Sequence, residues 1–171
     1  MKRFILAAVT LSTFLVSAQN APKPQLSVRL TSDKDSYTLR GNIQLKVVRE
    51  NTGNCSVAIH RRWEWGASSK IRVFDSKGSE NKDVLYAIDD PPPLTSVDFI
   101  LLKPGEWFGT QFNEVVRALV KSPGDYEILV EYRTYLSEDL ARKYVPRRDA
   151  VFWSRERATV TSNRIKLRIT E

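Results

Sequence analysis

Residues that could do catalytic chemistry are scarce in this sequence. His60 is the only histidine and Cys55 the only cysteine among 171 residues, so any histidine-dependent mechanism must pass through His60. The two lie five positions apart, and an odd separation puts them on opposite faces of an extended strand. A Cys–His pair would therefore need a bend between them, and no Gly-x-Ser-x-Gly sequence offers a serine nucleophile. We expect no catalytic residues and a protein that is not an enzyme.

The sequence offers equally little for a metal or cofactor site. A structural zinc site needs several His or Cys ligands, and the chain has one of each. Asp33 with Asp35, and Asp89 with Asp90, could hold calcium in turns, but neither stretch matches an EF-hand loop. Aspartate also stabilises turns through its own side chain, which accounts for both pairs. The sequence therefore predicts neither a metal ion nor a cofactor.

A run of arginine and tryptophan is the first candidate for binding. Arg61 and Arg62 precede Trp63 and Trp65, and the two tryptophans share one side if the preceding strand continues through them. Arginine beside tryptophan suits recognition of sugars, peptides or anionic groups through stacking and charge. The alternative is that a tryptophan fills the core while the arginines face water.

A basic and aromatic stretch from residue 136 to 160 is the second candidate. Long connections between strands often carry function when they are ordered, and we expect Arg147, Arg148 and Trp153 to contribute to binding here. The alternative is that the charges form a solvated face and Trp153 caps the core. Ser137 followed by Glu138 fits the capped start of a helix within this stretch.

The elements that must position these residues are predicted to be strands. Alternating apolar and polar residues predict strands over residues 26–30, 43–48, 55–59, 71–74, 126–133 and 165–169. A further strand over 99–102, a turn at Pro104-Gly105 and a return strand over 107–112 are also expected. We expect a weak strand at 84–86. Residues 113–120 could form a single helical turn or a loose strand, and we favour an irregular connector. Tyr126, which follows a Pro-Gly turn, is a candidate tyrosine corner that bonds back to the backbone.

Three sequence stretches together resemble immunoglobulin-like β-sandwich domains of secreted bacterial proteins, loosely of the proteinase-inhibitor and fibronectin types. They are Tyr37 to Gly53, Phe99 to Gly105 with Pro123 to Tyr126, and Trp153 with Thr161-Ser162-Asn163. The resemblance implies an all-β, immunoglobulin-like antiparallel sandwich of about seven to nine strands. A partly helical or irregular insertion would precede its last strand. Such domains serve many functions, so the resemblance assigns none.

The N-terminus predicts export. Lys2 and Arg3, an apolar run from residue 4 to 16 and small residues before Ala18 are typical of a signal peptide over 1–18, which leaves a single domain over 19–171. Without Lys2 and Arg3, 25 basic residues face 20 acidic ones. We expect a periplasmic or extracellular module, without a transmembrane segment after signal removal, that binds another envelope or extracellular protein. The alternative partner is a glycan or other polyanion; nucleic acid is not expected.

Overall fold

The computed structural model describes residues 21–63, 65, 68–85, 93–145, 147 and 149–171. The predicted signal peptide over 1–18 lies outside these residues and stays a prediction, as does the assignment of Arg148 to a binding site. None of the helices in the described part has the length and the apolar character that a membrane crossing requires.

Strands make up almost half of the described chain, far more than helices. They are β1 (Leu26–Ser32), β2 (Ser36–Thr38), β3 (Asn42–Asn51), β4 (Val57–His60), β5 (Ser69–Asp75), β6 (Glu80–Asn81), β7 (Phe99–Leu102), β8 (Trp107–Val115), β9 (Gly124–Tyr132), β10 (Val151–Phe152), β11 (Val160–Thr161) and β12 (Ile165–Thr170). The helices are η1 (Ser96–Asp98, a 3-10 helix), α1 (Val116–Leu119) and α2 (Glu138–Arg142). Eight of these strands have four residues or more, which agrees with the predicted seven to nine.

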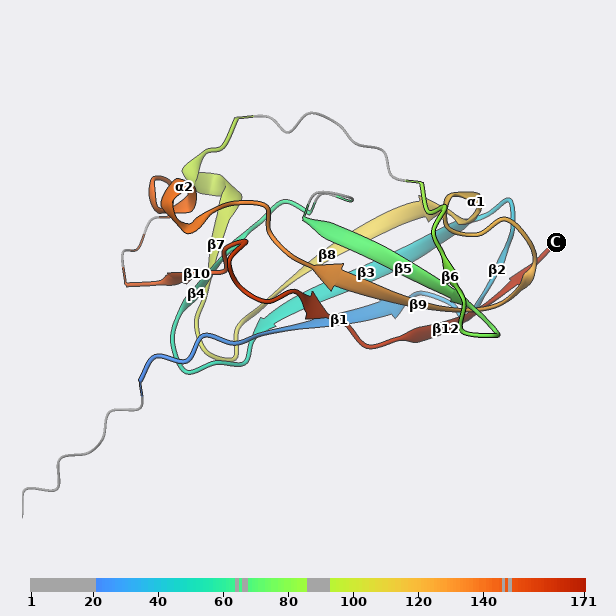
Figure 1. Ribbon diagram of the computed structural model, residues 1–171, viewed down its shortest axis with the longest axis horizontal. Coiled ribbons are helices and arrows are strands. Elements are labelled where there is room, and N and C mark those ends of the chain that lie inside the picture. Colours follow the sequence, from blue (N-terminus) through green and yellow to red (C-terminus); the bar gives the residue numbers. More distant parts are fainter. Residues whose placement is uncertain (1–20, 64, 66–67, 86–92, 146, 148) are drawn as a thin grey trace, which may run out of the picture.

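The long strands form two sheets with one core between them (Figure 1). One sheet has the order β1-β3-β8, and the other has the order β2-β12-β9-β5-β6, with β11 also paired to β9. Leu30 and Leu45 of the first sheet and Ile71, Val130 and Leu167 of the second belong to one buried apolar cluster. Because a strand turns alternate side chains to one face, each sheet needs the other to cover its apolar face. The predicted all-β sandwich is confirmed.

A third, smaller sheet ties the predicted insertion to the sandwich. Its order is β10-β4-β7, and it lies at the same end of the molecule as α2 (Figure 1). The parallel pairing of β10 with β4 joins Val151 to Val57 and Phe152 to Ala58. Helix α2 begins as predicted, because the Ser137 hydroxyl accepts a hydrogen bond from the Leu140 amide at 3.3 Å.

The expected hairpin over residues 99–112 is wrong, although both of its strands form. Strand β7 pairs with β4, whereas β8 pairs with β3, so the Pro104-Gly105 turn carries the chain from one sheet to another. Asn51 causes this switch by holding both sides of the turn. Its carbonyl accepts from the Gly105 amide at 2.8 Å, and its side-chain amide donates to the Leu102 carbonyl at 2.9 Å.

Two weaker expectations are also corrected. Val84 and Leu85 form no strand, and the Leu85 amide instead donates to the Ala118 carbonyl at 3.0 Å. Tyr86, the third residue of that expected strand, lies outside the described residues. The stretch 113–120 is not irregular, since its first three residues continue β8 and the next four form the single turn of α1.

Tyr126 forms the expected corner. Its hydroxyl donates to the Ser122 carbonyl at 2.9 Å, across the turn that precedes β9. We expect Tyr126→Phe to lower the free energy of unfolding by about 1 kcal/mol, the usual contribution of one hydrogen bond. Urea unfolding followed by circular dichroism measures the loss. Ser122→Ala, which keeps the carbonyl, is the control and should cost less; an unchanged Tyr126→Phe variant would show that the contact is not stabilising.

Candidate binding groove at the edge of β8

A groove of about 560 Å³ runs along one edge of β8. One wall consists of five consecutive β8 residues from Phe108 to Phe112, and the other of Arg61, Arg62, Trp63 and two residues of η1, Val97 and Asp98. Successive side chains of a strand point to opposite faces of the sheet. Five consecutive residues can therefore line the same groove only if the groove follows the edge of the strand. Among the described residues, β8 pairs with β3 alone, and this edge has no strand partner.

The wall opposite β8 is held in place by the Asp98 carboxylate. It accepts from Arg62 Nε at 2.8 Å and from the amide and hydroxyl of Thr95 at 2.7 and 2.9 Å. Burial opposes ionisation of this carboxyl, but the Thr95 hydrogen bonds and the Arg62 charge outweigh it and lower its pKa. The Asp98 carbonyl also accepts from the Arg61 amide. The predicted residues Arg61 and Arg62 are thus fixed at a built surface.

Arg49 lies behind this wall with a fully buried guanidinium, 0% exposed. The guanidinium carbon lies 5.2 Å from the ring centre of Trp63, 5.4 Å from that of Phe108 and 5.1 Å from that of Tyr132. Its two terminal nitrogens donate to the carbonyls of His60 at 2.7 Å and of Arg61 at 3.2 Å. Burial lowers the pKa of this guanidinium. Arg49 of β3 is therefore hydrogen-bonded to the last residue of β4 and to the residue that follows it. Its guanidinium has no carboxylate partner among the described residues.

His60 is also fully buried and does not face the groove as a reactive group. Its ring packs against Phe99 at 5.7 Å and Tyr135 at 6.0 Å between ring centres, and neither ring nitrogen has a hydrogen-bond partner. Burial lowers its pKa to about 4. The only histidine of the chain is therefore neutral at ordinary pH and out of reach of solvent.

The two predicted tryptophans of this segment meet but do not form a flat exposed surface. Trp63 and Trp65 contact each other edge to face, 5.5 Å apart, and both are half-buried against the main core. Trp63 stacks on Tyr132 at 5.4 Å, and Trp65 Nε1 donates to Glu114 at 2.8 Å. Only Trp63 lines the groove.

The structure separates the predicted residues of the insertion from this groove. Trp153 is 7% exposed and belongs to the main core, which is the alternative that the sequence left open for it. Arg147 is exposed but pairs with Asp149 at 2.9 Å, beside a separate hollow of about 150 Å³. Arg142 and Glu138 form a further local ion pair in this insertion. The described cations here are therefore largely compensated by neighbouring acids.

Two polar atoms in residues of the groove lack partners. Trp63 Nε1 and Thr110 Oγ1 are buried and make no hydrogen bond within the protein. Unsatisfied buried polar atoms are uncommon in folded proteins, and in this protein they also occur away from the groove, at His60 and Trp153.

A second and larger depression, about 1260 Å³, lies over β12 and the turn that follows β5. Part of its charged lining is paired within the protein, as in the Arg168–Asp125 contact at 2.9 Å, while no ion pair forms at Lys77 among the described residues. We regard the β8 groove as the stronger candidate because an unpaired strand edge lines it.

Sequence reasoning missed Val97, Arg49 and the exposed Trp107. Val97 is 70% exposed at the mouth of the groove, and Trp107 is 61% exposed on the outer face of β8. The alternation of apolar and polar residues in β3 predicts an inward position for Arg49, and that in β8 predicts an outward position for Trp107. Val97 lies in the 3-10 helix η1, where no regular pattern predicts its exposure.

Comparisons with known proteins find only distant likenesses. No family model matches the chain, and no curated protein sequence matches it. A CARDB domain from Pyrococcus furiosus is 16% identical, with 85% of this chain and 93% of that one covered and a TM-score of 0.39. The Bacillus subtilis sporulation control protein Spo0M is 10% identical over 85% of this chain and 49% of its own, with a TM-score of 0.43.

An Erythrobacter marinus β-glucosidase is 13% identical over 86% of this chain, with a TM-score of 0.42. This chain spans only 16% of the length of that enzyme. Likenesses this distant assign neither a family nor an activity to the chain.

Proposed function

We propose that this protein is an exported, non-catalytic binding module that takes an extended segment of a partner protein as an added strand along β8. The observation that carries the proposal is the groove lined by five consecutive residues of an unpaired strand. Main-chain hydrogen bonds to such an edge supply affinity, and pockets for alternate side chains supply specificity. The buried position of the only histidine supports binding rather than catalysis.

The groove also indicates the chemistry of the partner segment. Phe108 and Phe112 are half-buried beside the exposed Val97, so apolar side chains of the segment have surfaces to contact. Arg61 is exposed, and its guanidinium has no acidic partner among the described residues. The segment therefore combines apolar residues with a carboxylate that pairs with Arg61.

Amide hydrogen exchange tests the added strand. In the free protein, alternate amides of Trp107–Val115 should exchange rapidly, because they face the open edge. A photo-reactive amino acid at Val97 in the producing cells, with Lys166 on the opposite sheet as control site, identifies the contacting segment. A synthetic peptide of that segment should then protect those same amides, and Arg61→Glu should weaken its binding by about tenfold.

The results that contradict the proposal are equally specific. Equal cross-linking from Val97 and Lys166 would show that the groove is not the contact surface. A captured peptide that binds without protecting alternate β8 amides would show that it adds no strand. Wild-type affinity in Arg61→Glu would remove the acidic requirement.

A further inference from the structure

We propose that the outer face of the sheet β1-β3-β8 binds an anionic polysaccharide, with Trp107 as the stacking platform and with Arg29 and Lys46 as contacts to its acidic groups. This face adjoins the strand edge and shares Gly109 and Gln111 with it, but Trp107, Arg29 and Lys46 do not line the groove, so the site does not depend on the added-strand proposal. The sequence predicted a surface of basic and aromatic residues as the alternative binding site, and the proposed site has this character at residues that the sequence did not single out.

Trp107 lies along the sheet instead of standing up from it. Lys46 pairs with Gln111, four residues beyond Trp107, yet its amine is 6.0 Å from the Trp107 ring centre. The ring therefore extends along β8 across Gly109. A Cβ on Gly109 would lie 3.6 Å from the ring atom Cζ3, which is ordinary van der Waals distance, so the ring lies against this residue.

The register of the three strands places two cations and one carboxylate around this ring, since Glu50 of β3 pairs directly with Trp107. Arg29 of β1 pairs with Val48, and Val48 pairs with Gly109 beneath the ring, so Arg29 is two strands from Gly109, or about 10 Å. Lys46 lies in the next row along β3. Both cations are exposed, and neither has an acidic partner among the described residues.

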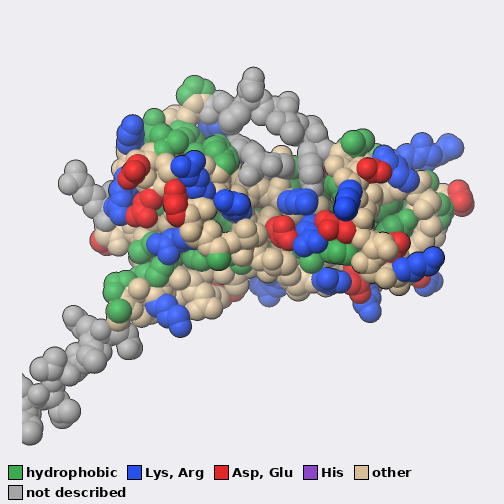
Figure 2. All heavy atoms as spheres, viewed as in Figure 1, with side chains coloured by type: hydrophobic (Ala, Val, Ile, Leu, Met, Phe, Trp, Pro, Cys, Tyr) green, Lys and Arg blue, Asp and Glu red, His purple; other side chains and the backbone are tan. Residues whose placement is uncertain are grey.

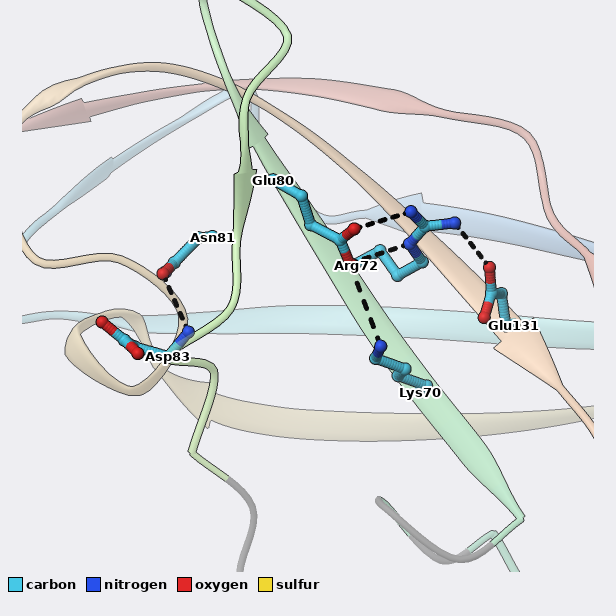
Figure 3. Close-up of polar contacts among 6 residues, drawn as sticks. All are labelled: Lys70, Arg72, Glu80, Asn81, Asp83 and Glu131. Carbon is cyan, nitrogen blue, oxygen red and sulfur yellow. Dashed lines mark hydrogen bonds and ion pairs between the residues drawn. The ribbon is translucent and has the colours of Figure 1, made fainter.

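The opposite sheet shows that unpaired cations are not the rule on this molecule. Arg72 of β5 contacts Glu80 at 2.7 Å and Glu131 at 2.8 Å, and Lys70 reaches Glu80 at 3.9 Å (Figure 3). Basic and acidic side chains accordingly lie side by side over β5 and β9 in the space-filling view (Figure 2). An anion at the opposite sheet would have to break such pairs, whereas Arg29 and Lys46 are available.

The mixture of groups favours an acidic sugar over a simple anion. A pyranose ring has a face of C–H groups that packs on an indole, whose face is electron-rich, and a uronic acid carries its carboxylate at the ring's edge. Gln44, Gln111 and Asn113 lie beside Lys46 and provide amides for hydroxyl groups. A polyphosphate or a nucleic acid backbone would pair with the cations but would make no contact that requires these amides or the face of the indole.

The test compares an alginate hexasaccharide, which is a uronic acid polymer, with polyphosphate of equal charge and with neutral cellohexaose. We expect calorimetric binding of the alginate probe alone, weakened about tenfold by Trp107→Gln and about three- to tenfold by Lys46→Gln or Arg29→Gln. Lys166→Gln removes the same charge from the opposite sheet and should stay within about twofold of wild type.

Several outcomes would overturn the site. They are equal binding of polyphosphate, wild-type affinity in Trp107→Gln, equal effects of Lys46→Gln and Lys166→Gln, and no binding of the alginate probe at low ionic strength. Arg61→Glu, which tests the strand edge, should leave alginate binding unchanged. The two proposals can therefore fail independently.

Discussion

Replacing Arg49 by alanine should lower the free energy of unfolding by about 3–5 kcal/mol, the largest single-residue effect we expect in this protein. The substitution empties the space among three aromatic rings. It also leaves the carbonyls of His60 and Arg61 without their donors, and an unpaired buried acceptor costs about 1–3 kcal/mol. Urea unfolding monitored by tryptophan fluorescence gives the value.

Arg49→Met separates packing from charge. Methionine keeps most of the side-chain bulk and removes a cation whose burial is itself costly, so we expect less than half of the alanine loss. Equal losses in the two variants would mean that the hydrogen bonds dominate and packing is secondary. A loss below about 1 kcal/mol in Arg49→Ala would contradict the buried contacts altogether.

Acid should destabilise the protein well above the range in which its carboxylates titrate, and His60 is the reason. Its pKa is about 4 in the folded protein, against an ordinary value near 6.5 in the unfolded chain. The unfolded chain therefore takes up the proton first. Stability is full above pH 6.5, falls as the pH drops from 6.5 to 4 and levels off below 4, with a total loss of roughly 3 kcal/mol.

His60→Leu should remove this part of the pH dependence. No hydrogen bond is lost, because neither ring nitrogen has a partner. Burial alone would raise the pKa of Asp98, but hydrogen bonds from Thr95 and the charge of Arg62 lower it below its usual value. The stability that ionised Asp98 contributes is therefore lost at a more acidic pH than the stability that depends on His60. Unfolding free energies at pH 7.5, 6.0, 5.0 and 4.5 should fall in the wild type and stay nearly flat in the variant. Parallel curves would show that His60 is accessible to protons in the folded state.

The sequence predicted the sandwich because most of its strands follow a strict period of two. The prediction of buried and exposed residues was wrong where a side chain was polar at an inward position of the alternation or apolar at an outward one. Ile43, Leu45 and Val47 point inward, and the same phase continues to Arg49 and Asn51, both fully buried. Arginine is usually exposed, so the alternation alone was not taken as evidence that Arg49 is buried.

Trp107 is the converse case. Phe108 and Phe112 mark the inward phase of β8, so Trp107 lies in the outward phase, opposite to what its apolar side chain favours. Phase alone would have found both residues. It could not have revealed that β7 and β8 join different sheets, because that depends on the contacts of Asn51 with residues about 50 positions away along the chain.

The place of β12 in its sheet has a consequence for how the chain folds. This last strand, Ile165–Thr170, pairs with β9 on one side and with the early strand β2 on the other, in parallel. A chain that stops before Ile165 leaves both neighbours with open edges. Sheet closure therefore waits for contacts between segments more than 130 residues apart, which favours slow folding and a long-lived open state.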